Sequence, residues 1–434
     1  MLCLNLAFKT LLAYLLLLDI SLASESHFQY QGVAIGGWLV LEPYITPSLF
    51  LEFNSTNTSS DIPVDEYHYC KALGQSEARK RLVTHWSLFY NQSDFAKIKS
   101  YGLNMVRIPI GYWAFEMLDD DPYVAGAAEY LDQAIEWCAD LDLKVWVDLH
   151  GAPNTQNGFD NSGLRNIGYP GWQNKTEYVE LTERVLQKIY TRYGNDTFKD
   201  TVIGIEVLNE PYGPSLDLHK LRDFYIRTYQ DAREIQTSNN TIVYHDAFEP
   251  IGWWNDFKNV TSSDLKPRRY ENGTYIAQNS TTTTNNSTLQ NYNILIDHHH
   301  YEVFTVDGLN LTIEEHISNI KSYTSNIRDN ELSVHPALVG EFLAALTDCT
   351  PWLNGVGLGA RCAGEAPYDN QRLGDRLGIN DWSKRTKLQK RNTRKWMEIE
   401  LDKKGHNTYG WSFWCCRTET TQGWAVNRPV ELSL

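Results

Sequence analysis

Two glutamates at the ends of short apolar runs are the residues of this sequence best suited to acid–base chemistry. Glu210 stands in an Asn-Glu-Pro motif and Glu341 in a Gly-Glu-Phe motif. Cleavage of a glycosidic bond needs one carboxyl group to protonate the leaving oxygen and a second to attack or to activate water. A lone glutamate at a strand end is more often solvated or salt-bridged, so the pair gains its weight from the residues around it.

Arg107 lies inside the apolar run 106–110. An unpaired charge buried there would cost several kcal/mol, so a buried carboxylate should face it. We expect Glu341 to be that partner, and we expect the arginine to lower the pKa of Glu341 into the range of a nucleophile. A purely stabilising ion pair is the alternative.

A third apolar run ends in Asp297-His298-His299-His300-Tyr301. Alternation along a strand places His299 and Tyr301 on one face and His298 and His300 on the other, so only one pair can line an interior. A His-x-His metal site is conceivable on that geometry. Because no acidic or thiol set clearly completes it, we expect no metal.

Other polar and aromatic residues also fall near the ends of apolar runs. His150 is followed by a polar loop at 156–161, whose side chains suit sugar hydroxyls. Trp414 stands near the end of the last run, where its face can stack under a pyranose or pack in the core.

Apolar segments alternate with amphipathic ones along the chain. The candidate strands are 33–39, 104–110, 144–150, 202–209, 241–247, 294–301, 337–342 and 408–415, and the clearest candidate helices are 130–141, 177–193, 216–234, 313–327 and 384–401. This alternation predicts an α/β fold, a (β/α)8 TIM barrel with catalytic groups at the carboxyl ends of the strands. A doubly wound open sheet is the alternative, but residues 34–38 lack its Gly-x-Gly-x-x-Gly turn.

The composition limits the partners. Lys and Arg total 39 against 54 Asp and Glu in 434 residues, a formal charge of −15. Such a chain repels phosphate backbones and anionic lipids, so we expect no nucleic-acid partner. We predict a single catalytic domain over residues 24–434, with a Thr-, Asn- and Ser-rich glycosylated loop insertion at about 264–293.

The first 23 residues predict a cleaved signal peptide, because an early Lys9 and the apolar run 11–18 precede small residues at Ser21 and Ala23. The run is too short to span a bilayer, and residues 426–434 lack the hydrophobic tail of a lipid-anchor signal, so no membrane anchor is expected. Twelve Asn-x-Ser/Thr sequons favour a secreted glycoprotein. They begin at Asn54, Asn57, Asn91, Asn174, Asn195, Asn239, Asn259, Asn272, Asn279, Asn285, Asn286 and Asn310.

The cysteines permit disulfides without specifying them. Of seven cysteines, six remain when Cys3 is removed with the signal peptide. Fifteen full pairings are then open, and a fold of this size does not need disulfides. Cys349 with Cys362 is the single pairing that we favour.

Five motifs occur in order along the chain: Gly36-Gly37-Trp38-Leu39-Val40-Leu41-Glu42-Pro43, Arg107-Ile108-Pro109-Ile110-Gly111-Tyr112-Trp113, Asn209-Glu210-Pro211, His298-His299-His300-Tyr301 and Gly340-Glu341-Phe342. Together they resemble the fungal exo-β-1,3-glucanases of glycoside hydrolase family five, over residues 32–419. The resemblance implies a (β/α)8 barrel, release of glucose from the non-reducing ends of β-1,3-glucan with retention of configuration, and no cofactor. It implies a secreted, extracellular enzyme of the cell wall, which we expect to be a monomer.

The resemblance also implies roles for particular residues. Glu210 is implied as the acid/base and Glu341 as the nucleophile. The other shared active-site positions fall on Arg107, His150, Asn209, His299, Tyr301 and Trp414. Glucose-contacting positions fall on Glu42, Asp160 and Asn161, and the aromatic pair that flanks the entrance falls on Phe159 and Phe304.

Two other functions stay open at this point. One is a glucan-binding wall protein that kept the barrel and lost turnover, and the other is an endo-acting cellulase or mannanase on the same barrel. The long segment 343–407 between the last two predicted strands favours a walled pocket and exo action.

Overall fold

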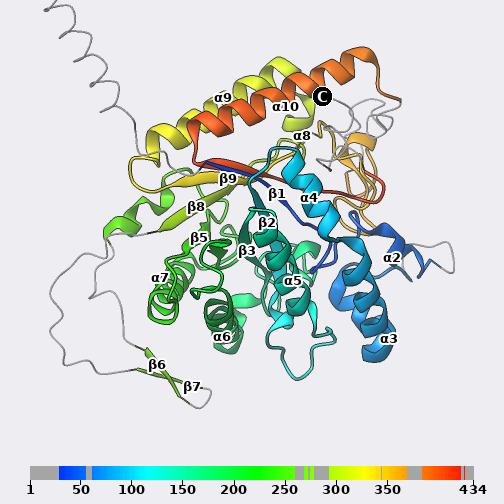
Figure 1. Cartoon of the computed structure of the whole chain (residues 1–434). Helices are drawn as coiled ribbons and strands as arrows, with labels where there is room; N and C mark the ends of the chain where they lie inside the picture. The colour runs from blue at the N-terminus through cyan, green and yellow to red at the C-terminus, as the bar shows by residue number, and fades with distance from the viewer. Residues whose placement is uncertain are drawn as a thin grey trace, which may run out of the picture.

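Eight parallel strands form a closed barrel in the order β1, β10, β9, β8, β5, β4, β3, β2. The computed structural model describes residues 29–54, 61–259, 268–271, 274–277, 293–343, 345–368, 384–421 and 425. The barrel strands are β1 (Tyr30–Ala34), β2 (Met105–Gly111), β3 (Lys144–Gly151), β4 (Val202–Glu206), β5 (Thr241–His245), β8 (Ile294–His299), β9 (Ala337–Glu341) and β10 (Gly410–Phe413). The predicted (β/α)8 barrel is confirmed, and Figure 1 shows helices packed around the sheet.

The helices connect successive strands on the outside of the barrel. They are α2 (Pro47–Leu51), α3 (Glu66–Phe89), α4 (Gln92–Ser100), α5 (Ala127–Asp140), α6 (Thr176–Tyr193), α7 (Leu218–Ile235), α8 (Val306–Asn310), α9 (Ile313–Asn330) and α10 (Lys387–Asn407). The five expected helices correspond to α5, α6, α7, α9 and α10. The long helix α3 escaped prediction because it bends at Gly74, where φ is 73°, and the bend interrupts its stripe of buried residues.

The first predicted strand was placed too late in the chain. Strand β1 ends at Ala34, whereas the prediction ran over 33–39. Residues 35–39 are buried, but they form a turn in which Gly37 has a φ of 67°. An apolar run is therefore buried here without being a strand, because burial alone does not distinguish a strand from a buried loop.

The predicted loop insertion at 264–293 lies mostly outside the described residues. Within it, β6 (Arg268–Glu271) and β7 (Thr274–Ala277) pair antiparallel. This hairpin was not predicted, because the composition of the segment suggested a loop without regular structure. The predicted signal peptide also falls outside the described part of the chain.

Alternation along the strands fills the barrel interior in layers. The lower layer is apolar and consists of Met105, Trp146, Val243, Leu295 and Leu338. Two residues further along the same strands stand the fully buried polar side chains of Arg107, Asp148, His245 and Asp297. Since residues two apart on a strand share a face, the polar layer lies above the apolar one, toward the carboxyl ends of the strands.

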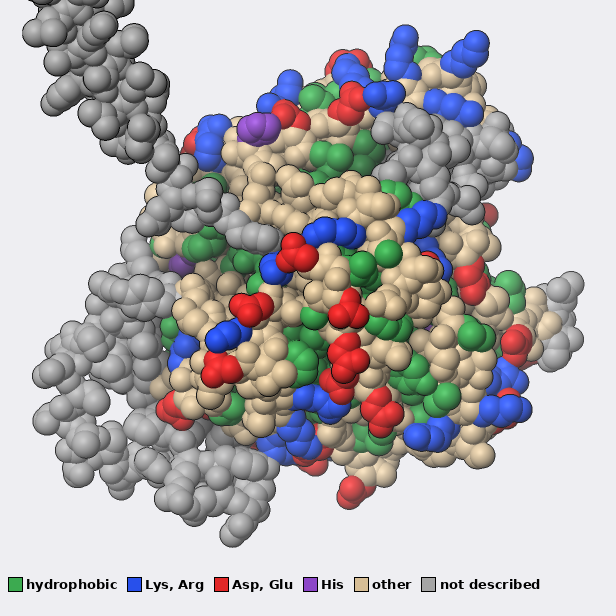
Figure 2. Space-filling model, in the orientation of Figure 1, with side chains coloured by type: hydrophobic (Ala, Val, Ile, Leu, Met, Phe, Trp, Pro, Cys, Tyr) green, Lys and Arg blue, Asp and Glu red, His purple; other side chains and the backbone are tan. Residues whose placement is uncertain are grey.

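Figure 2 shows acidic and basic side chains interspersed on one face of the molecule. The predicted disulfide between Cys349 and Cys362 is confirmed, while Cys70, Cys138, Cys415 and Cys416 are buried thiols. No helix in the described part of the chain combines the length and the apolar character needed to cross a membrane.

Candidate active site

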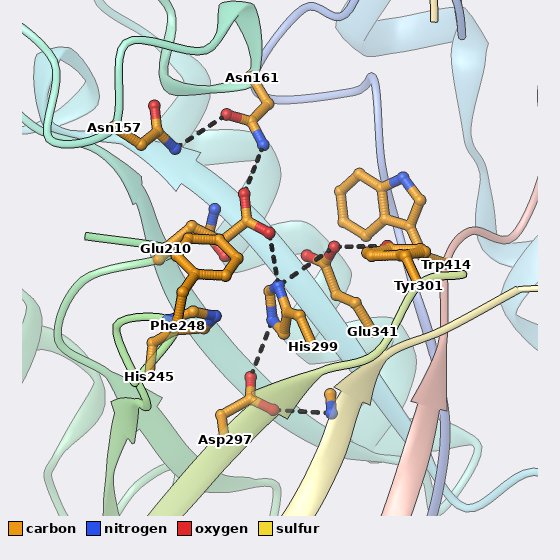
Figure 3. A network of polar contacts seen from close by, with 12 residues as sticks. Asn157, Asn161, Glu210, His245, Phe248, Asp297, His299, Tyr301, Glu341 and Trp414 are labelled. Atoms are coloured by element: carbon orange, nitrogen blue, oxygen red, sulfur yellow. Dashed lines mark hydrogen bonds and ion pairs between the residues drawn. The ribbon is translucent and has the colours of Figure 1, made fainter. Parts of the chain in front are cut away.

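The two glutamates lie at the carboxyl ends of separate strands and contact the same histidine. Glu341 is the last residue of β9, His299 is the last residue of β8, and Glu210 follows β4 with a φ of 46°. The Nδ1 atom of His299 is 2.7 Å from Oε1 of Glu210 and 3.4 Å from Oε2 of Glu341. Figure 3 shows both carboxylates directed toward this imidazole.

Glu341 is held by two donors besides His299. Arg107 Nη1 donates to its Oε1 at 2.6 Å, and the Tyr301 hydroxyl donates to its Oε2 at 2.7 Å. The predicted contact between Arg107 and Glu341 is therefore confirmed. The predicted direction of the pKa is wrong: burial raises the pKa of Glu341 above its usual value, and it outweighs the opposing charges of His299 and Arg107.

Glu210 has the opposite balance. Burial raises the pKa of its carboxyl, but the hydrogen bond and charge of His299 outweigh burial and hold that pKa below the usual value. Asn161 Nδ2 also donates to Oε2 of Glu210 at 3.0 Å. Although the side chain is buried, it is thus stabilised as an anion in the free site.

His299 carries the positive charge between these groups. Burial lowers its pKa, but Glu341, Asp297 and Glu210 outweigh burial and raise that pKa well above the usual value. Its Nε2 donates to Oδ2 of Asp297 at 3.2 Å. Both nitrogens of the ring are consequently engaged as donors.

Arg107 is fully buried beneath the two glutamates and reaches more groups than Glu341. Its Nε and Nη2 donate to Oε2 of Glu206 at 2.9 and 2.7 Å. Nη2 also lies 3.1 Å from Oδ2 of Asp148 and donates to Oδ1 of Asn209 at 2.7 Å. The sequence predicted one buried partner for this guanidinium, and the structure places three carboxylates around it.

His150 and Trp414 form the wall beside this cluster. Their rings stack with 5.6 Å between centroids and 2° between planes. His150 Nδ1 donates to Asp148 at 2.6 Å, and Trp414 Nε1 donates to the hydroxyl of Tyr44 at 2.5 Å. Trp414 is buried, and Figure 3 shows it beside Glu341 and Tyr301. Sequence reasoning missed Tyr44, which lies in a buried turn instead of at a strand end.

Two further acidic side chains present oxygens that have no partner in the free site. Oε1 of Glu42 and Oδ2 of Asp160 are buried without a donor. Burial and the charge of Asp160 raise the pKa of Glu42 well above its usual value, and burial raises the pKa of Asp160 to about 7. Oxygens of this kind can accept hydrogen bonds from ligand hydroxyls.

Aromatic rings lie near the two glutamates, Glu210 and Glu341. Phe304 contacts Tyr301 edge to face at 5.5 Å and is 36% exposed, while Phe159 contacts Tyr212 at 5.8 Å. Phe248 is 40% exposed and contacts both Tyr212 and His245. Sequence reasoning missed Phe248, although its place directly after the predicted strand 241–247 was an available signal.

Two groups of side chains among the described residues are close enough together to be tested as metal sites: Glu210, His245 and His299, and Glu206, Asp297 and His299. His245 Nδ1 accepts from the backbone N–H of Ala247 at 3.0 Å, so a neutral ring carries its hydrogen on Nε2. Neither nitrogen of His245 then offers a free lone pair. Both nitrogens of His299 are donors, so these groups suit a hydrogen-bond network better than an ion.

Comparison with known proteins gives a consistent set of similarities. Residues 70–349 match the family model described as cellulase, glycosyl hydrolase family 5. A glucan 1,3-beta-glucosidase 2 of Candida albicans is 54% identical over 413 residues, covering 93% of this chain and 83% of that protein. A sporulation-specific glucan 1,3-beta-glucosidase of Saccharomyces cerevisiae is 43% identical over 412 residues, covering 93% of this chain and 84% of that protein. The crystal structure of a rutinosidase from Aspergillus niger matches with a TM-score of 0.64 at 16% identity, covering 93% of this chain and 97% of that one. At this low identity the match shows a shared fold alone.

Proposed function

The chain belongs to glycosyl hydrolase family 5, and from that premise we propose that it is a retaining glucan exo-1,3-β-glucosidase that releases glucose from the non-reducing ends of β-1,3-glucan. The substrate class follows the names of two glucan 1,3-beta-glucosidases that are 54% and 43% identical to this chain. The chemistry rests on the two strand-end glutamates and their shared histidine.

The observation that carries the proposal is the short distance between the carboxylate oxygens of Glu210 and Glu341. Because His299 Nδ1 lies 2.7 Å from one oxygen and 3.4 Å from the other, those oxygens are at most about 6.1 Å apart. Retaining enzymes hold their carboxyl groups about 5–5.5 Å apart, whereas inverting enzymes need about 6.5–9.5 Å to admit a water. This upper limit on the separation of the two oxygens therefore favours direct attack by one carboxylate.

Glu341 is the nucleophile of this proposal. Its ionised oxygen attacks the anomeric carbon while Glu210 gives its proton to the glycosidic oxygen, which leaves with the rest of the glucan. Water then attacks the glycosyl-enzyme, Glu210 takes a proton from it, and Glu341 leaves. Two inversions at one carbon return the β configuration.

The proton for the first step has a short route to Glu210. In the free site it resides on His299, whose Nδ1 is 2.7 Å from Oε1 of Glu210. Transfer along this hydrogen bond gives a neutral imidazole and a protonated Glu210, which is the form that acts as a general acid. The same contact supports the assignment of Glu210 in place of Glu341 as the acid.

The glucose unit is held by the groups around the pair. The buried oxygens of Glu42 and Asp160 that lack a donor accept hydrogen bonds from hydroxyl groups of the glucose unit. Asn161 contacts both Glu210 and the sugar. His150, Asn209 and Trp414 form the wall of the pocket, and Phe159 and Phe304 flank its entrance.

The enzyme acts, in this proposal, as a secreted, monomeric glycoprotein on the glucan of the cell wall, without a metal or cofactor. Sequons at Asn91, Asn174, Asn239 and Asn310 lie on exposed side chains of the described residues, where a glycan would have room. The signal peptide at residues 1–23 and the catalytic domain from residue 24 belong to the same proposal.

The decisive experiment is product analysis on laminarin. Proton NMR recorded before mutarotation should show β-glucose as the first sugar released, and a 2-deoxy-2-fluoro glucoside with a good leaving group should label Glu341. Oligosaccharide products would favour the endo-acting alternative, and binding without release of sugar would favour the glucan-binding protein. Initial α-glucose, or label on another residue, would overturn the assignment of the nucleophile.

A further inference from the structure

Beneath the catalytic pair, three carboxylates surround one guanidinium in a place that water does not reach. Arg107, Asp148 and Glu206 have no exposed surface, and Glu341 is only 3% exposed. The nitrogens of Arg107 lie 3.1 Å from Asp148, 2.7 Å from Glu206 and 2.6 Å from Glu341. One guanidinium cannot balance three buried negative charges at such distances, and the positive charge of His299 is shared with Glu210 and Asp297.

The hydrogen bonds of Asp148 and Glu206 leave one oxygen free on each side chain. Oε2 of Glu206 accepts from both Nε and Nη2 of Arg107, and Oδ2 of Asp148 accepts from His150 Nδ1 at 2.6 Å and faces Arg107. Oε1 of Glu206 and Oδ1 of Asp148 are buried without any donor. The two residues are direct cross-strand partners of β3 and β4.

We propose that Glu206 is protonated in the native enzyme, that its Oε1 donates this hydrogen to Oδ1 of Asp148, and that it thereby acts as a positioning residue for Arg107 and the nucleophile. The proton belongs on Oε1, since Oε2 already accepts two hydrogen bonds. This single hydrogen gives a hydrogen-bond partner to both Oε1 of Glu206 and Oδ1 of Asp148, the two oxygens that otherwise lack one.

The electrostatics of the surroundings agree with this placement. The charged and titratable groups that face Glu206 are Arg107 on β2, Asp148 on β3, Asp297 and His299 on β8, and Tyr225 on α7. Burial, together with Asp148 and Asp297, raises the pKa of Glu206 well above its usual value, although Arg107 opposes this. Burial raises the pKa of Asp148, but the charges of Arg107 and His150 outweigh burial and hold that pKa below the usual value, so the proton is placed on Glu206 and not on Asp148.

The proton has a consequence for the nucleophile. With Glu206 neutral, the charge of Arg107 is divided between Asp148 and Glu341 alone. An ionised Glu206 would compete for that charge and would raise the pKa of Glu341 further. The proton thus keeps Arg107 available to Glu341, and this part of the inference rests on the proposed role of Glu341 as nucleophile.

The test compares Glu206→Gln with the matched variant Asp148→Asn. Glutamine has the shape of a protonated glutamate and can donate to Asp148, so E206Q should keep kcat/KM on laminarin within about threefold, with an unchanged acid limb of the pH profile. D148N removes the charge that faces Arg107 and His150, and it should lose tenfold or more. A shift of the acid limb of E206Q to lower pH would overturn the proposal, because it would mean that a negative charge had been removed. An E206Q protein that does not fold while D148N folds would also overturn it.

Infrared spectroscopy tests the proton independently of catalysis. The spectrum of the wild type minus that of E206Q should contain the carbonyl stretching band of a protonated carboxylic acid at neutral pH. The subtraction separates this band from those of other buried acids such as Glu66, whose pKa burial raises to about 8. Absence of the band in an enzyme that still releases glucose would overturn the proton on Glu206 and leave the proposed function standing. Presence of the band in a protein without glucan hydrolysis would support the proton and refute the proposed function.

Discussion

Substitution of Tyr301 by phenylalanine tests how Glu341, the proposed nucleophile, is kept ionised. The hydroxyl of Tyr301 donates to Oε2 of Glu341 at 2.7 Å, and the substitution removes this bond while keeping the ring. A hydrogen bond to a charged group contributes about 1.5–3 kcal/mol. Since one pKa unit corresponds to about 1.36 kcal/mol, the pKa of Glu341 should rise by about one to two units. The direction is upward because the bond stabilises the charged form.

The assay is the pH dependence of kcat/KM on laminarin and on an aryl β-glucoside. The acid limb should move to higher pH by about one to two units, so activity at a fixed pH below the limb should fall by about ten- to a hundredfold. Tyr193→Phe is the matched control, because Tyr193 donates to Asp132 at 2.9 Å between α5 and α6, on the outside of the barrel. The control should lose some stability and keep its pH profile. An unchanged acid limb in a folded Tyr301→Phe enzyme would refute the reasoning.

Three further outcomes are expected. Glu210→Ala should lower activity on laminarin by about 10²–10⁴-fold, because the proton donor is lost. Aryl glucosides with acidic phenols should keep their glycosylation step, and added azide should speed their turnover. Equal losses on all substrates without an azide effect would contradict the acid/base role. Burial alone lowers the pKa of His298, but its hydrogen bonds with Asp246 and Glu331 raise it from 6.5 to about 10. This stabilisation is complete below pH 6.5 and is lost as the pH rises toward 10, so the wild-type Tm should fall more steeply over that range than that of His298→Gln, and equal slopes would refute the pairing. The secreted chain should begin near Ser24 and run faster on gels after endoglycosidase treatment, whereas an unglycosylated cytosolic protein with Met1 intact would contradict secretion.

The sequence predicted those features that depend on the local pattern of apolar and polar residues. Parallel strands buried on both faces are short apolar runs, so the eight barrel strands could be found from hydrophobicity alone. Alternation also placed His298 and His299 on opposite faces of one strand, and His298 is found between Asp246 and Glu331 behind the sheet. The same criterion failed for residues 35–39, because a buried turn and a buried strand have the same hydrophobicity.

The sequence could not predict the balance of charges in the site. Arg107 was correctly paired with Glu341, and the direction of the pKa was then inferred from that one contact. Glu206 and Asp148 also contact the arginine, and burial acts on every carboxylate at once. Such sums depend on three-dimensional distances between residues that are far apart in the chain, so they become available only from the structure.

The glycine in the Gly-Glu-Phe motif shows how packing explains a residue that chemistry alone would not select. The backbone N–H of Gly340 donates to Oδ1 of Asp297 at 2.7 Å. A Cβ atom at this position would collide with the Asp297 carboxylate, which also accepts from His299. The close approach therefore requires glycine, because it lets Asp297 hold the imidazole that contacts both Glu210 and Glu341. Gly340, the residue before Glu341, in this way supports the histidine that also contacts Glu210.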